Sequence, residues 1–178
     1  MNLQERAKPR HAAAISFPNS SLGTRWRSAA VAVEAAVVLP VMLFLLLFLI
    51  IGGMLVFRHQ QVACQAREAA RWACVRGGDY QKDTDQASPT QQQILEQAVL
   101  PLAQGMDPNS LVVRVQWIDQ GSNAVQNWDP APKDVRSITP QGEYVSNKVR
   151  VTVTYLWNSG ILIGPISLQS VSELPMAY

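Results

Sequence analysis

The longest feature of the hydropathy pattern is an apolar run from Ala35 to Phe57 that contains no charged residue. A helix of this length rises about 34 Å, and the hydrocarbon core of a bilayer is about 30 Å thick. Residues 41–51 also lack the polar face that a surface helix of a soluble protein carries. We therefore predict one transmembrane helix. We favour this over a cleaved signal peptide because the run is long and follows a long leader.

Small side chains continue at helical spacing beyond the apolar run, and this spacing predicts one long helix from about Ala30 to Arg76. The residues concerned are Val62, Ala66, Ala69, Ala70 and Ala73. We expect the helix to stop at Gly77 and Gly78, because glycine readily adopts positive φ values at a helix C-terminus.

The remaining residues predict an α+β domain. Residues 90–104 place apolar side chains on one helix face, at Ile94, Leu95, Ala98, Val99 and Leu102. Three strands are predicted at 111–118, 148–155 and 166–173 from β-branched residues and from alternation of polar and apolar positions. The expected organisation is therefore a leader at 1–29, a long helix at 30–77 and a head at 78–178. The head should contain one helix and a three-stranded antiparallel sheet.

More than 20 irregular residues separate the first two predicted strands, and Trp128 lies among them. Loops of this length are uncommon in compact domains unless they have a function or are disordered. Trp128 is therefore a candidate for contact with a partner. The favoured alternative is that its ring pins the loop onto the core.

Charge is divided unevenly along the chain. Residues 1–77 contain nine Lys and Arg against three acids, whereas residues 78–178 contain six bases and ten acids. An acidic head without a basic stripe argues against nucleic-acid binding. The basic leader mixes proline, glycine and serine without apolar periodicity, so we expect residues 1–28 to be mostly disordered. The basic residues flanking the span do not decide its orientation.

The sequence offers little chemistry for catalysis. The two histidines, His11 and His59, lie outside the head and have no evident partner. No phosphate loop, zinc pattern or nucleophile elbow is present in the sequence. Cys64 and Cys74 would be about 15 Å apart along a continuous helix, too far for a disulfide. We therefore predict a protein that is not an enzyme, without a cofactor or a metal site.

Glu34 stands at the edge of the apolar run, where an acid requires an explanation. A carboxylate entering the membrane needs a cationic partner or a place among the headgroups. The simpler alternative is a solvated acid favoured by the dipole at a helix start. Ala32 and Ala36 on either side of Glu34 would let neighbouring helices approach closely.

Three segments together resemble a known family. They are the run RSAAVAVEAAVVLP at 27–40, QAREAARWA at 65–73 and VRGG at 75–78. This combination is similar to the TadE-like proteins, which are type IV pilin-like pseudopilins of the tight-adherence (Flp) pilus. The resemblance is close over residues 25–78 and looser over the second helix and the strand at 149–155.

The resemblance implies a cytoplasmic leader, a helix in the inner membrane and a pilin-like α+β head in the periplasm. In such families a prepilin peptidase removes the leader and leaves the acid as the fifth residue of the mature chain. Here this would place the cut between Ala29 and Ala30, where the family prefers glycine before the cut and this chain has Ala29. Glu34 would then pair with the new amino group of a neighbouring subunit.

The function implied is a minor, non-catalytic subunit of a pilus-assembly or related secretion machine that acts by helix packing in the membrane. Its partners would be other pilus subunits, inner-membrane assembly proteins, a prepilin peptidase and the lipid bilayer. The alternative is an uncleaved, membrane-anchored binding module. Such a module would hold a periplasmic partner with the head or the Trp128 loop.

Overall fold

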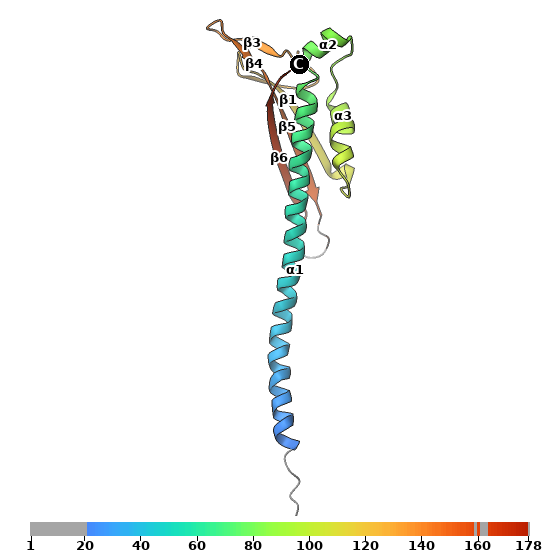
Figure 1. Cartoon of the computed structure of the whole chain (residues 1–178), viewed down its shortest axis with the longest axis vertical. Helices are drawn as coiled ribbons and strands as arrows, with labels where there is room; N and C mark the ends of the chain where they lie inside the picture. The colour runs from blue at the N-terminus through green and yellow to red at the C-terminus, as the bar shows by residue number, and fades with distance from the viewer. Residues whose placement is uncertain (1–20, 159, 161–163, 178) are drawn as a thin grey trace, which may run out of the picture. The chain divides into compact units, whose positions relative to one another are not determined.

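A computed structural model describes the chain at residues 21–158, 160 and 164–177 (Figure 1). It has a long N-terminal apolar helix followed by a sheet-containing head, which confirms the predicted α+β class. The chain divides into two compact units, Met1–Leu47 and Phe48–Tyr178, and the long helix runs from the first into the second.

The long helix, α1, spans Ser21–Cys74. It begins nine residues earlier than predicted, so part of the expected leader is helical, while the predicted disorder of residues 1–20 falls outside the described residues. The predicted reason for its end is wrong, because Gly77 has a φ of −84°. Gly78 instead allows a close approach: its N–H donates to Lys133 O at 2.8 Å, and a Cβ at Gly78 would lie 3.1 Å from the same oxygen.

Two short helical segments follow α1. The helix α2, Gly78–Thr84, was not among the predicted elements. The predicted second amphipathic helix consists of an α-helical turn α3, Gln91–Ile94, a π-helical turn η1, Leu95–Val99, and a 3₁₀ turn η2, Leu100–Leu102. Pro101 accounts for the change of turn type, because it has no N–H to donate. A short 3₁₀ turn η3, Pro108–Ser110, leads into the sheet.

The main sheet is antiparallel throughout and has four strands in the order β2-β1-β5-β6. They are β1 Leu111–Asp119, β2 Ala124–Asn127, β5 Lys148–Trp157 and β6 Ile166–Pro175. The three predicted strands are present, but the prediction of a three-stranded sheet is wrong. Sequence reasoning missed β2 because it has only four residues, three of them exposed. A separate hairpin pairs β3, Arg136–Ile138, with β4, Tyr144–Ser146.

The core of the head forms where the C-terminal part of α1 packs on one face of the main sheet (Figure 1). The small residues predicted on this part of the helix, including Val62, Ala66 and Ala73, are all fully buried. Alternate residues of β5, such as Val151, are also fully buried. Small side chains on the helix allow close packing, so this contact provides much of the apolar burial of the head.

Asn147 fixes the end of the head farthest along α1. Its side chain is fully buried, receives a hydrogen bond from Gln120 N at 3.0 Å and donates to Asp134 O at 2.8 Å. Its carbonyl accepts a hydrogen bond from Met176 N at 2.8 Å. The side chain of Asn147 therefore ties the turn after β1 to the loop before β3, and its backbone carbonyl holds the chain after β6.

Candidate assembly surface

The N-terminal half of α1 carries a long run of exposed apolar side chains. Its large apolar side chains are exposed at Val31, Val33, Val37, Val38, Leu39, Val41, Met42, Leu43, Phe44, Leu45, Leu46, Phe48, Leu49 and Ile50. Among the described residues, one helix is long and apolar enough to cross a membrane, and none of its most apolar stretch is buried. Apolar surface of this extent needs lipid or other helices around it. The helix is therefore a membrane anchor.

Glu34 lies in α1 with its side chain exposed, and no described residue forms a hydrogen bond or an ion pair with it. Ala30 stands one turn before it, on the same side of the helix, because residues i and i+4 are neighbours. Ala32 and Ala36 are likewise one turn apart and exposed. The carboxylate is thus available to a cation on another molecule, beside small residues that permit close helix contact.

Ala29 and Ala30, the predicted processing position, are exposed and lie inside α1. The peptide bond between them therefore belongs to a hydrogen-bonded helix. A peptidase that cuts here must first unwind about one turn of α1. The sequence did not indicate this requirement, because the predicted helix began at Ala30 itself.

Arg58, the first residue after the apolar run, binds the head. Its Nη1 donates to Gln61 Oε1 at 2.8 Å and to the backbone carbonyl of Gln104 at 3.2 Å. Gln61 donates to the same carbonyl at 3.3 Å. The loop accommodates these contacts at Gly105, which has a φ of +68° and approaches the Arg58 guanidinium closely. In the sequence alone, Arg58 is one of the basic residues that flank the predicted transmembrane helix.

Gln65 forms a second polar contact between α1 and this loop. Its side chain is fully buried, and its Nε2 donates to the sulfur of Met106 at 3.4 Å. Its Oε1 is buried without a hydrogen-bond partner among the described residues. A thioether is a weak acceptor, so this amide positions the loop more than it stabilises it.

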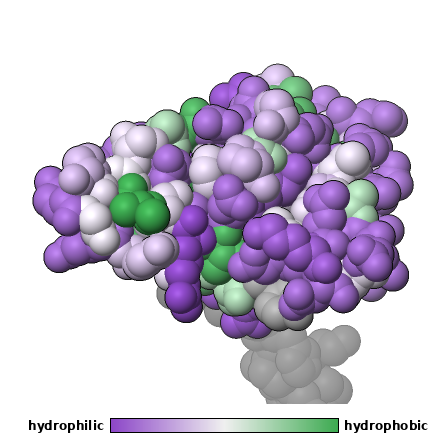
Figure 2. Space-filling model, turned by 90° about the horizontal axis from the view of Figure 1, so that it is seen from above, coloured by the Kyte–Doolittle hydropathy of each residue, from purple (hydrophilic) through white to green (hydrophobic). Residues whose placement is uncertain are grey.

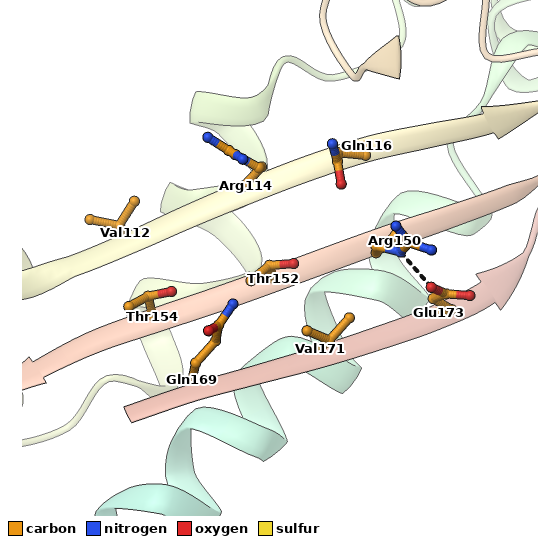
Figure 3. Close-up of a pocket in the computed structure, with 9 residues that line it drawn as sticks. All are labelled: Val112, Arg114, Gln116, Arg150, Thr152, Thr154, Gln169, Val171 and Glu173. Atoms are coloured by element: carbon orange, nitrogen blue, oxygen red, sulfur yellow. Dashed lines mark hydrogen bonds and ion pairs between the residues drawn. The ribbon is translucent and has the colours of Figure 1, made fainter. Parts of the chain in front are cut away.

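The outer face of the main sheet, opposite α1, carries a shallow hollow of about 500 Å³ (Figure 3). Its lining is largely polar and comprises Val112, Arg114, Gln116, Arg150, Thr152, Thr154, Gln169, Val171 and Glu173. Arg150 and Glu173 form an ion pair across β5 and β6. These side chains offer hydrogen-bond donors and acceptors and one ion pair to a molecule that lies on this face.

Trp128 is fully buried. Its Nε1 donates to Pro89 O at 2.7 Å and its backbone N–H donates to Val115 O at 3.0 Å. Lys133 Nζ lies 5.5 Å from the ring centroid, and burial lowers the pKa of Lys133 although Asp129 opposes the shift. The ring therefore holds the β2–β3 connection against the head.

Cys64 and Cys74 are not bonded to each other in the structure. Cys64 is exposed on α1, whereas Cys74 is buried at the end of α1. The Cys74 thiol donates to Arg71 O at 3.2 Å, and burial raises its pKa. Among the described residues no three His, Cys, Asp or Glu side chains are grouped to hold a metal ion.

A comparison with family models matches residues 29–71 to the family described as TadE-like protein. The match confirms the resemblance and lies wholly within α1. No curated protein and no solved structure matches the chain. The family implies a Tad pilus-associated, pseudopilin-like protein that interacts with pilus components, and its members are typically structural. The anchor helix described above is consistent with this class.

Proposed function

We propose that the chain is a minor, non-catalytic subunit of a tight-adherence pilus or a related secretion machine. The observation that carries the proposal is the family match over residues 29–71, on a helix whose apolar surface is exposed. A protein that assembles through such a helix needs neither a metal nor a nucleophile. Its work is to pack beside other membrane helices of the same machine.

Glu34 would direct this packing. We propose that the leader is cut between Ala29 and Ala30, and that Glu34 then accepts hydrogen bonds from the new ammonium group of a neighbouring subunit. In a low-dielectric environment such a pair forms only with good geometry, because each charge alone is costly to bury. Ala32 and Ala36 would let the two helices come close enough for the pair to form.

The proposed topology places the leader in the cytoplasm, α1 in the inner membrane and the head in the periplasm. Alkaline phosphatase fused after Tyr178 should be active in a bacterial host, because this reporter folds only outside the cytoplasm. A fusion that is inactive there, with a cytoplasmic reporter active at the same position, would contradict the topology.

Deletion of the gene in its own host tests the function. We expect loss of surface pili in electron micrographs and restoration by the full chain. A variant in which residues 35–57 are replaced by an unrelated transmembrane helix should be inserted but should not restore pili. Normal piliation of the deletion strain would contradict the proposal.

A membrane-anchored binding module remains the second candidate, and the hollow on the outer sheet face is the observation in its favour. The hollow, rather than the Trp128 loop, would then contact the partner. Intact-mass measurement of the mature protein separates the two. A chain that begins at Ala30 supports the pilus subunit, and an uncut chain supports the binding module.

A further inference from the structure

The end of the main sheet at which β6 begins is its lower end in Figure 1. This end lies beside the last turns of the apolar run. At the upper end, Ala177 N–H donates to Cys74 O at 3.0 Å, which joins the chain after β6 to the end of α1. Ile166, the first residue of β6, precedes Ala177 by eleven positions, or about 36 Å of extended chain. The same distance measured back along α1 from Cys74 is about 24 residues and reaches the level of Ile50, next to Ile51.

The packing of α1 agrees with this estimate. Ile51 and Leu55 are partly buried against the core of the head, whereas Met54 and Val56 between and beside them are exposed. Ile166 is partly buried against the same core. Ile51 and Leu55 both belong to the uncharged run that ends at Phe57. The head therefore overlaps the end of the apolar run by more than one helical turn.

This overlap sets the depth of the head. A hydrocarbon core of about 30 Å takes up about 20 residues of helix. Counted from Ala35, the first residue after Glu34, those residues end at Met54. The lower end of the sheet, at the level of Ile51 to Leu55, thus coincides with the boundary between acyl chains and headgroups.

Three apolar side chains are exposed at this end of the head. Leu156 is 49% exposed near the end of β5, and Val112 is 63% exposed beside it near the start of β1. Leu102 is 38% exposed, two residues before the carbonyl that Arg58 binds. Isolated exposed apolar residues are common, and others are exposed elsewhere on the head, at Val125, Ile138 and Tyr144. We name the end that carries Leu156, Val112 and Leu102 the membrane-facing end, because it lies at the level of the apolar run.

Charged side chains lie farther along the outer sheet face. Figure 3 shows Val112 and Thr154 toward one end of the outer sheet face and the Arg150–Glu173 ion pair toward the other. Seen from above, the head is predominantly hydrophilic (Figure 2). On the outer sheet face the charged pair therefore lies farther from the apolar run of α1 than Val112 does.

We propose that the membrane-facing end rests in the headgroup region of the bilayer that α1 crosses, with lipid as its ligand. Leu156, Val112 and Leu102 contact the upper acyl chains, and Arg58 lies at the level of the lipid phosphates. The inference rests on the membrane anchoring contained in the proposed function. Lipid contact on two elements restricts tilting of the head and keeps the β3–β4 hairpin away from the membrane.

Depth-dependent fluorescence quenching tests this contact in the full chain reconstituted into phosphatidylcholine vesicles. An environment-sensitive label is attached at Leu156→Cys in a Cys64→Ser background, while Cys74 stays buried. Quenching is supplied by lipids that carry a nitroxide near the glycerol end of the acyl chain. Val125→Cys is the matched control, since Val125 is 48% exposed on β2, which pairs with the opposite end of β1. Met42→Cys, within the apolar run, reports the anchor itself.

We expect quenching and a blue-shifted emission at Leu156 and at Met42, with neither at Val125. Quenching at Met42 but not at Leu156 would overturn the inference and leave the anchor intact. Absence of quenching at both positions would overturn the anchoring and the proposed function with it. A blue shift at Leu156 that depends on protein density and not on the nitroxide lipid would show a second copy at this end, and would also overturn the inference.

Discussion

Arg58 Nη1 donates a hydrogen bond to the backbone carbonyl of Gln104, 3.2 Å away and 46 residues later in the chain. The donor is the first residue after the apolar run, and the acceptor follows the helical segment that packs beside β1. The end of the anchor is therefore joined directly to the head. Movement of α1 at this level must move the loop at 104–106 with it.

Replacing Arg58 by alanine should loosen this junction. The substitution removes a charge-assisted hydrogen bond to Gln104 O and leaves Gln61 as its one remaining donor, so we expect a loss of about 1–2 kcal/mol in unfolding free energy. Amide hydrogen exchange in detergent should accelerate at residues 104–106. Arg67→Ala is the control, because Arg67 is exposed and bonds only within its own helix, to Ala63 O. Equal effects of the two variants would contradict the assigned role.

Trp128 should matter for stability. Trp128→Ala leaves a cavity beside Pro89 and should cost about 3–5 kcal/mol in denaturant unfolding. Trp128→Phe keeps most of the packing but leaves Pro89 O without its donor, so we expect a smaller loss of about 1–3 kcal/mol. Unchanged stability of both variants, with loss of a partner, would instead place Trp128 in a binding loop.

Because of Cys74, the stability of the protein should decline as the pH becomes alkaline. Its pKa is raised above the ordinary value of 9.0 by burial, so the folded state keeps a proton that the unfolded state loses. The contribution of the protonated Cys74 thiol to the free energy of unfolding is fully present below the pKa of this thiol in the unfolded state. It is lost as pH rises through the pKa of the thiol in the folded state. Cys74→Ala should remove this part of the decline in denaturant midpoint, whereas Cys64→Ala should not. Alkylation at neutral pH should also be faster at Cys64, and preferential labelling of Cys74 would contradict its burial.

The elements that could be read from the sequence are those specified by local patterns. The apolar run and the alternation of Lys148–Tyr155 depend on neighbouring positions alone, so α1 and β5 could be predicted. The strand β2 depends on pairing with β1, and three of its four residues face solvent. Its four residues, AVQN, carry no strand pattern of their own.

The functional and structural residues also differ in whether the sequence alone reveals them. Glu34 is conspicuous because an acid beside an apolar run is costly, and the family match supports its segment. Asn147 and Arg58 act through partners 13 to 46 residues away, which no local pattern encodes. Trp128 was identified as important, and only the fold shows that its ring faces inward.

Co-purification of the Glu34→Gln variant with other pilus subunits tests the central proposal most directly. Glutamine keeps the shape of the side chain and removes its charge, so the ammonium group of a neighbouring Ala30 would lose its counter-charge in the membrane. Glu143→Gln, in the turn between β3 and β4, is the control for loss of one acid from the head. We predict normal accumulation and membrane insertion of both variants, with pili and co-purification lost only for Glu34→Gln. Assembly of Glu34→Gln as in the wild type, or its degradation before assembly, would contradict the role of Glu34 in joining subunits.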